Sequence, residues 1–128
     1  MAAEKILILE DDPLVARVYA KALREDGKDV TVCTQFEDAR EKLKNSRPDA
    51  VLTDVRVGVY NGLQLAHLFR MTSPTGRVVV VSGYDDTVVR KEVSELDGQF
   101  ILKPIRISDL RSAFGSLRDQ PARAVAAR

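Results

Sequence analysis

The sequence predicts an α/β fold in which five parallel strands form a doubly wound sheet with helices on both faces. Short apolar runs alternate along the chain with segments whose apolar residues recur at helical spacing, an exchange of periods that is typical of such folds. Three runs, residues 6–9, 50–53 and 78–81, are almost continuously apolar, as expected for strands covered on both faces. The length of 128 residues fits one domain with a single core.

The strand at residues 6–9 is followed by a helix that is expected to end near Gly27, a residue suited to a C-terminal cap. Val30 and Val32 then alternate with polar neighbours, which predicts a second strand. The expected buried face of the first helix carries Val15, Val18, Tyr19 and Ala22.

Thr34 is expected to cap the second helix, which stops before Arg47 because a residue preceding proline disfavours helical backbone. The third strand, residues 50–53, runs directly into Asp54. The apolar residues expected on the second helix are Phe36, Ala39 and Leu43.

A loop containing Gly58 and Gly62 leads to the third helix, which ends at the turn signal of Ser73 and Pro74. The strand at residues 78–81 then ends at Ser82. The third helix is expected to present Leu65, Leu68 and Phe69 to the core.

A fourth helix is expected to end at Asp97-Gly98, and residues 100–102 form the fifth strand before Lys103-Pro104. The predicted domain covers residues 4–118. Residues 119–128 are expected to be a flexible tail, too short for a DNA-binding output domain. The apolar faces expected for the last two helices carry Val89, Val93 and Leu96, and then Leu110, Ala113, Phe114 and Leu117.

Helical connections make neighbouring strands parallel, and right-handed crossovers favour the strand order 2-1-3-4-5. This arrangement is the flavodoxin-like (βα)5 sandwich. Ligands of such sheets bind beyond the carboxyl ends of the strands, where the strand order reverses. A binding site is therefore expected between the ends of the first and third strands.

Charge and composition exclude several classes of function. The formal net charge is +1, which gives no basic excess for binding nucleic acid or an anionic membrane. The single cysteine, Cys33, excludes an internal disulfide. No apolar run is long enough to cross a bilayer, and residues 1–5 lack a signal-peptide pattern. A cytoplasmic protein is expected.

Charged and hydroxyl side chains follow four of the predicted strands. Glu10 and Asp11 follow the first strand, Asp54 the third, Ser82 the fourth and Lys103 the fifth. Carboxylates gathered this closely repel one another unless a cation neutralises them, and Mg²⁺ is the ion that binds through one or two carboxylates plus phosphate oxygens. A lysine and a hydroxyl would stabilise the remaining phosphoryl oxygens. The residues indicate phosphoryl chemistry.

These motifs resemble the receiver domains of two-component response regulators, the CheY-like superfamily. The resemblance covers residues 4 to about 118. The elements that carry it are Glu10-Asp11-Asp12-Pro13, Asp54, Asn61-Gly62-Leu63, Ser82-Gly83 and Lys103-Pro104.

The resemblance implies that Asp54 is the phosphoacceptor and takes a phosphoryl group from a phosphohistidine of a histidine kinase or histidine phosphotransfer protein. It implies Mg²⁺ held directly by Asp11 and Asp54, through water by Glu10, and by the backbone carbonyl of Arg56. Asp12 is left outside the metal shell, because an acid at a helix start has its own structural explanation.

The resemblance also assigns a switch. Lys103 pairs with Asp54 and later with the phosphoryl group, and the Lys103-Pro104 peptide bond is expected to be cis. Ser82 follows the phosphoryl group, and Phe100 turns into the vacated space. The fourth helix, fifth strand and fifth helix then change as an output surface. Phe100 lacks a tyrosine hydroxyl, so as a switch it can signal only through packing. Ordinary packing in the core, without a switch role, explains this residue at least as well.

Three further positions depart from the commonest family pattern. Gly58 stands where proline is frequent, which predicts a more flexible loop. Arg56 and Tyr84 resemble the family positions that govern water access to the phosphoryl group, and their bulk predicts slow autodephosphorylation.

Several alternatives remain open on the sequence alone. They are a receiver that binds partners without phosphorylation, a Mg²⁺-dependent aspartyl-phosphate hydrolase, and a flavin or nucleotide carrier. This sequence lacks the second acid that such a hydrolase would carry two residues after Asp54. It also lacks the glycine-rich phosphate loop that a flavin or nucleotide carrier would need. The expected partners are the histidine kinase or phosphotransfer protein and a downstream protein. A phosphorylation-dependent homodimer is also open. Direct binding to nucleic acid or to a membrane is not expected. The chain fits either a stand-alone regulator or a piece of a longer one.

Overall fold

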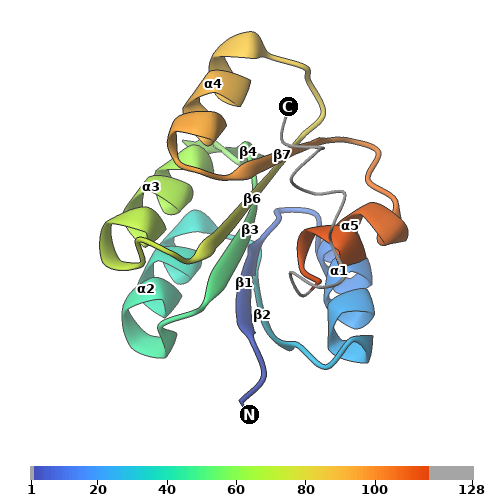
Figure 1. Cartoon of the computed structure of the whole chain (residues 1–128). Helices are drawn as coiled ribbons and strands as arrows, with labels where there is room; N and C mark the ends of the chain where they lie inside the picture. The colour runs from blue at the N-terminus through green and yellow to red at the C-terminus, as the bar shows by residue number, and fades with distance from the viewer. Residues whose placement is uncertain (1, 116–128) are drawn as a thin grey trace.

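The computed structural model describes residues 2–115, which form a five-stranded parallel sheet and a separate two-stranded hairpin. The elements are β1 Lys5–Leu9, α1 Pro13–Glu25, β2 Asp29–Cys33, α2 Phe36–Ser46, β3 Ala50–Asp54, β4 Arg56–Val57, β5 Tyr60–Asn61, α3 Leu63–Thr72, β6 Arg77–Ser82, α4 Thr87–Glu95, β7 Gln99–Leu102 and α5 Ile107–Ala113. The order β2-β1-β3-β6-β7, with every neighbour parallel, confirms the predicted topology. Helices α2, α3 and α4 cover one face of the sheet, and α1 and α5 cover the other (Figure 1).

The central strands are buried on both faces, which explains their continuous apolar runs. On β1, Leu7 and Leu9 pack with α2, α3 and α4, whereas Ile6 and Ile8 pack with α1 and α5. This alternation follows from the two-residue period of a strand. All four side chains are at most 1% exposed. Polar and charged side chains can therefore be accommodated at the ends of these strands.

The helices differ from the expected ones in three details. Val18 is 53% exposed, because α1 packs on the sheet through a different face, which carries the small Ala16, Ala20 and Ala22 beside Tyr19 and Leu23. Leu68 of α3 is 36% exposed, whereas Leu65, Ala66 and Phe69 of that helix are buried. Gln35, and not Thr34, is the N-cap residue of α2, and it makes no side-chain capping bond. Helix α5 ends at Ala113. Leu117, the expected domain end at 118 and the tail lie outside the described residues.

Among the described helices, none combines the length and hydropathy that a bilayer crossing requires.

The segment after Asp54 forms the antiparallel hairpin of β4 and β5, which the sequence did not predict. Strands of two residues are too short to leave a periodic signal. Gly58 in the turn has φ +60°, a left-handed conformation that glycine adopts readily and that proline, with φ near −65°, cannot take. Tyr60 stacks on Phe36 of α2 with ring centroids 5.0 Å apart. The glycine therefore shapes a defined turn beside Asp54.

Gly62 allows the start of α3 to lie directly against the end of β3. Its N–H donates to the Val55 carbonyl oxygen at 2.6 Å. A Cβ atom at position 62 would lie 1.7 Å from the Asp54 carbonyl oxygen, so any side chain there forces the backbone to move. Gly62 thus sets how closely α3 approaches the backbone that carries Asp54.

Replacing Gly62 with alanine is expected to destabilise the domain, because the new methyl group overlaps the Asp54 backbone. We expect the free energy of unfolding, measured by urea denaturation, to fall by about 1 to 3 kcal/mol. Gly83→Ala is the control, since a Cβ there meets no atom within 4 Å, and its effect should stay within about 0.5 kcal/mol. Equal losses in the two variants would contradict this account of Gly62.

Candidate functional site

The parallel topology brings the predicted site residues to one edge of the sheet. Glu10 and Asp11 directly follow β1, and Asp54 and Ser82 are the last residues of β3 and β6. Lys103 directly follows β7. Because β1, β3, β6 and β7 are neighbours and point the same way, their carboxyl ends meet where the sequence places these side chains.

The Lys103 ammonium joins two carboxylates at the centre of this edge. Its Nζ lies 2.7 Å from Asp54 Oδ2 and 3.1 Å from Glu10 Oε1. The Asp54 and Glu10 side chains are 11% and 3% exposed. The contact with Asp54 was expected, and the equally direct one with Glu10 was not. The Lys103-Pro104 peptide bond is cis, as expected.

Burial and hydrogen bonding act against each other on the pKa values of Glu10 and Lys103. Burial raises the pKa of Glu10, although the Asp12 N–H and Lys103 partly oppose the rise. Burial alone would lower the pKa of Lys103, but its hydrogen bonds to Asp54 and Glu10 outweigh burial and raise that pKa above its ordinary value. Lys103 therefore stays charged, and its charge opposes the rise that burial imposes on the pKa of Glu10.

Tyr19 of α1 is an additional ionisable group near the site. It is buried, and burial raises the pKa of its phenol to about 12, with smaller effects of Lys103, Glu10 and Asp54. Its place on the buried face of α1 was predicted, but its proximity to the charges of the site was not. No sequence signal links a helix residue to strand ends that are distant along the chain.

Glu10, Asp11 and Asp54 form an acidic cluster whose carboxylate oxygens lie within 4.8 Å of one another. All three offer only oxygen, the donor that Mg²⁺ prefers. Asp11 is exposed, and its Oδ2 accepts the Gly58 N–H at 3.2 Å. An open, oxygen-rich cluster with one exposed carboxylate fits an ion that keeps part of its water shell.

Asp12 lies outside the acidic cluster, in agreement with the sequence analysis. It is the N-cap residue of α1, and its carboxylate accepts the N–H groups of Leu14 and Val15. These N–H groups have no partner within the helix, so helix capping is sufficient to explain a carboxylate at this position.

Ser82, Tyr84 and Arg56 form the wall of the site on the α4 side. The buried Ser82 hydroxyl accepts the Tyr84 N–H at 3.1 Å. The Arg56 guanidinium lies over the Tyr84 ring, 5.4 Å from its centroid, and the Arg56 N–H donates to Asp54 Oδ1 at 3.4 Å. All three residues line an open groove of about 800 Å³. The predicted role of the Arg56 carbonyl as a metal ligand stays a prediction.

Phe100 on β7 is half-buried and packs against the core formed with α2, α3 and α4. Arg90 of α4 covers its ring, with the guanidinium carbon 4.4 Å from the centroid. Arg90 also pairs with Asp85 in the loop after β6. Neither Arg90 nor Asp85 was singled out from the sequence, since a charged pair in a helix start has no distinctive pattern.

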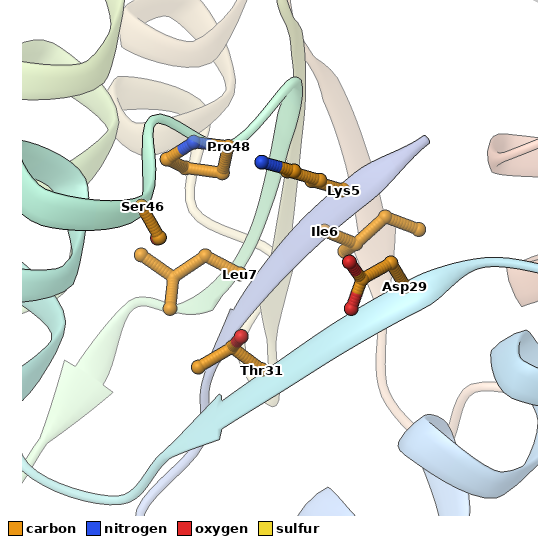
Figure 2. Close-up of a pocket in the computed structure, with 7 residues that line it drawn as sticks. All are labelled: Lys5, Ile6, Leu7, Asp29, Thr31, Ser46 and Pro48. Atoms are coloured by element: carbon orange, nitrogen blue, oxygen red, sulfur yellow. The ribbon is translucent and has the colours of Figure 1, made fainter. Parts of the chain in front are cut away.

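A second, smaller pocket lies where β1 and β2 begin, at the opposite ends of these strands from the acidic cluster. Figure 2 shows its lining by Lys5, Leu7, Asp29 and Thr31, together with Ser46 and Pro48. Its volume is about 110 Å³. It contains none of the predicted site residues.

Comparison with known proteins identifies a family. The model of the response regulator receiver domain matches residues 6–115. The sensory transduction protein LytT of Bacillus cereus is 35% identical over 104 residues, which cover 78% of this chain and 41% of that protein. The DNA-binding response regulator MtrA of Mycolicibacterium smegmatis is 26% identical over 123 residues, which cover 93% and 54%. The chain spans about half the length of these curated relatives.

Solved structures show the same fold. The non-phosphorylated HemR receiver domain from Leptospira biflexa matches with a TM-score of 0.80 at 21% identity, covering 92% of this chain and 94% of that one. A response regulator from Burkholderia pseudomallei, solved with a phosphorylated aspartic acid and a calcium ion, matches with a TM-score of 0.82 at 18% identity, covering 97% and 73%.

Replacing Lys103 with glutamine leaves Glu10 and Asp54 without their shared cation. We expect the free energy of unfolding at pH 8 to fall by about 3 kcal/mol, the cost of leaving a buried charge unpaired. The loss should shrink at pH 5. Lys103 lowers the pKa of Glu10, so without Lys103 this already raised pKa rises further. A raised acid pKa destabilises the folded state as pH rises through it, and at pH 5 a protonated Glu10 avoids that cost.

Urea denaturation at both pH values measures this difference. Lys21→Gln is the control, because the pair of Lys21 with Glu25 is exposed and should change stability by less than about 1 kcal/mol. A loss for Lys103→Gln that is the same at pH 5 and pH 8 would contradict the electrostatic account.

Proposed function

Because the chain belongs to the response regulator receiver domain family, we propose that it accepts a phosphoryl group on Asp54 and signals by changing its contacts with protein partners. Receiver domains are signalling modules of two-component systems. The observation that carries the proposal is the pairing of Asp54 with Lys103 at 2.7 Å, beside the carboxylates of Glu10 and Asp11. This arrangement offers a nucleophile and a fixed cation at one edge of the sheet.

In the proposed transfer, a carboxylate oxygen of Asp54 attacks the phosphorus of a phosphohistidine on a histidine kinase or phosphotransfer protein. The new O–P bond forms as the N–P bond of the donor breaks, and the imidazole leaves with the electron pair of that bond. Lys103, already bound to Asp54, then binds a phosphoryl oxygen. Ser82 accepts the Tyr84 N–H, which leaves its hydroxyl proton free to donate to another phosphoryl oxygen.

The acidic cluster supports a role for Mg²⁺. Asp11 and Asp54 would hold the ion directly, Glu10 through water, and Arg56 through its main-chain carbonyl. Bound there, Mg²⁺ neutralises the carboxylates and the phosphoryl oxygens. Lys103 cannot replace it, because Lys103 is already shared by two carboxylates.

The signal passes outward through the loop after β6. Movement of Ser82 towards the phosphoryl group opens space for Phe100, and α4, β7 and α5 change as one surface. A downstream protein or a second copy of the chain binds that surface in one of its two states. The proximity of β6 and β7 supports this route, since the Lys103 N–H donates to the Ser82 carbonyl oxygen at 2.8 Å.

Incubation with acetyl phosphate and Mg²⁺ tests the proposal by intact mass. We expect one phosphoryl adduct on the wild-type protein and none on Asp54→Asn or in the presence of EDTA. Asp12→Asn is the matched control, because Asp12 caps α1 outside the acidic cluster, and it should keep the adduct. A folded wild-type protein that takes no phosphoryl group from acetyl phosphate or from a phosphohistidine donor would instead be a receiver that works without phosphorylation.

Removing both members of the Arg56–Tyr84 contact is expected to speed loss of the phosphoryl group. The contact covers the α4 side of the site, so the Arg56→Ala, Tyr84→Ala double variant opens a path for the hydrolytic water. We expect the dephosphorylation rate, followed by intact mass, to rise about three- to tenfold, a change of about 1 kcal/mol in the barrier. Arg40→Ala, an exposed arginine of α2, serves as the control. An unchanged rate in the double variant would remove the shielding role.

A further inference from the structure

The loop between β6 and α4, residues 83–86, lies between two contacts of an arginine with an aromatic ring. On the site side, Arg56 lies over Tyr84 at 5.4 Å. On the other side, Asp85 pairs with Arg90, which covers Phe100. The loop therefore contacts the segment after Asp54 directly, and it is connected through Arg90 to Phe100, the residue expected to act as the switch aromatic.

Arg90 makes its two contacts at the same time. Its Nε lies 2.5 Å from Asp85 Oδ1, and its guanidinium carbon lies 4.4 Å from the centre of the Phe100 ring. A planar guanidinium can bind a carboxylate along its edge while its face rests on an aromatic ring. The carboxylate of Asp85 thus orients the group that covers Phe100.

The two ends of this arrangement are held differently. Helix α4 is tied to α3, since His67 Nε2 lies 2.6 Å from Glu92 Oε2 and the Arg70 side chain donates to the Leu96 carbonyl oxygen at 2.9 Å. Asp85 instead lies three residues after Ser82. Asp85 also directly precedes Asp86, the N-cap residue of α4, so it stands where a shift of Ser82 would meet the fixed helix.

We propose that the Asp85–Arg90 pair holds Phe100 in its unphosphorylated position and releases it when Ser82 draws the loop towards the phosphoryl group. This inference rests on the proposed function. Moving Asp85 takes away the carboxylate that orients the guanidinium over the ring, and the ring loses its cover. Arg90 is a positioning residue that connects the phosphorylation site to Phe100, and it touches no reacting atom.

The test follows backbone amide signals of Val80 and Ile101 by NMR in the full chain. Both residues neighbour Phe100, Val80 across the sheet and Ile101 along β7, and neither is changed. Spectra are recorded for the free protein and with beryllofluoride and Mg²⁺, an unreactive mimic of the phosphoryl group. The two wild-type positions define a line along which a shift in population moves each signal.

Removing the pair should move the free protein towards the beryllofluoride position. We expect Arg90→Gln and Asp85→Asn to change the ratio of the two states by about two- to fivefold, the size expected for an exposed cation–π contact. Arg90→Lys keeps a cation and should lie closer to wild type than Arg90→Gln. Lys91→Gln, an exposed neighbour on α4, should leave the signals unmoved.

The outcomes separate this inference from the proposed function. If every variant takes a phosphoryl group but the Arg90 and Asp85 variants stay at the wild-type position, or if Lys91→Gln moves equally, the inference is overturned and the proposed function stands. If the wild-type protein takes no phosphoryl group, both fail together.

Discussion

The contact of one ammonium group with a buried and a partly buried carboxylate is the interaction on which the rest of the site depends. Lys103 binds Asp54 and Glu10, and its own N–H binds the Ser82 carbonyl oxygen. The ends of β1, β3, β6 and β7 are thereby joined through one residue. Carboxylates this close together would otherwise repel and take up protons. The cation is hydrogen-bonded to Asp54 at 2.7 Å, and it stands where a phosphoryl oxygen would need a positive partner.

The walls around this contact come from loops that the sheet supports. Gly58 turns the β4–β5 hairpin so that its N–H reaches Asp11, and Gly62 brings α3 against the backbone of Asp54. On the α4 side, Arg56 and Tyr84 cover the groove next to Ser82. The charged residues of the site thus come from the strand ends. The loops after β3 and β6 determine how open the site is to solvent and connect it to the surface.

The relatives place this module in different settings. One is described as a sensory transduction protein and another as a DNA-binding response regulator, and the chain spans about half the length of either. The shared part is the receiver domain itself. In this chain the charged cluster lies at the strand ends, whereas contacts such as the Asp85–Arg90–Phe100 arrangement lie in the outer loop and helix, so the two belong to different parts of the fold.

The sequence by itself determined the five main strands, their order and the residues at their carboxyl ends, because buried parallel strands leave continuous apolar runs and each run stops at a polar side chain. It also placed Asp12 at the helix start. Only the tertiary structure decided that Glu10 shares Lys103 with Asp54, that a hairpin follows β3, and that Val18 faces solvent. It alone paired Asp85 with Arg90 over Phe100. These features depend on distances between separate elements, and short-range periodicity carries no information about such distances.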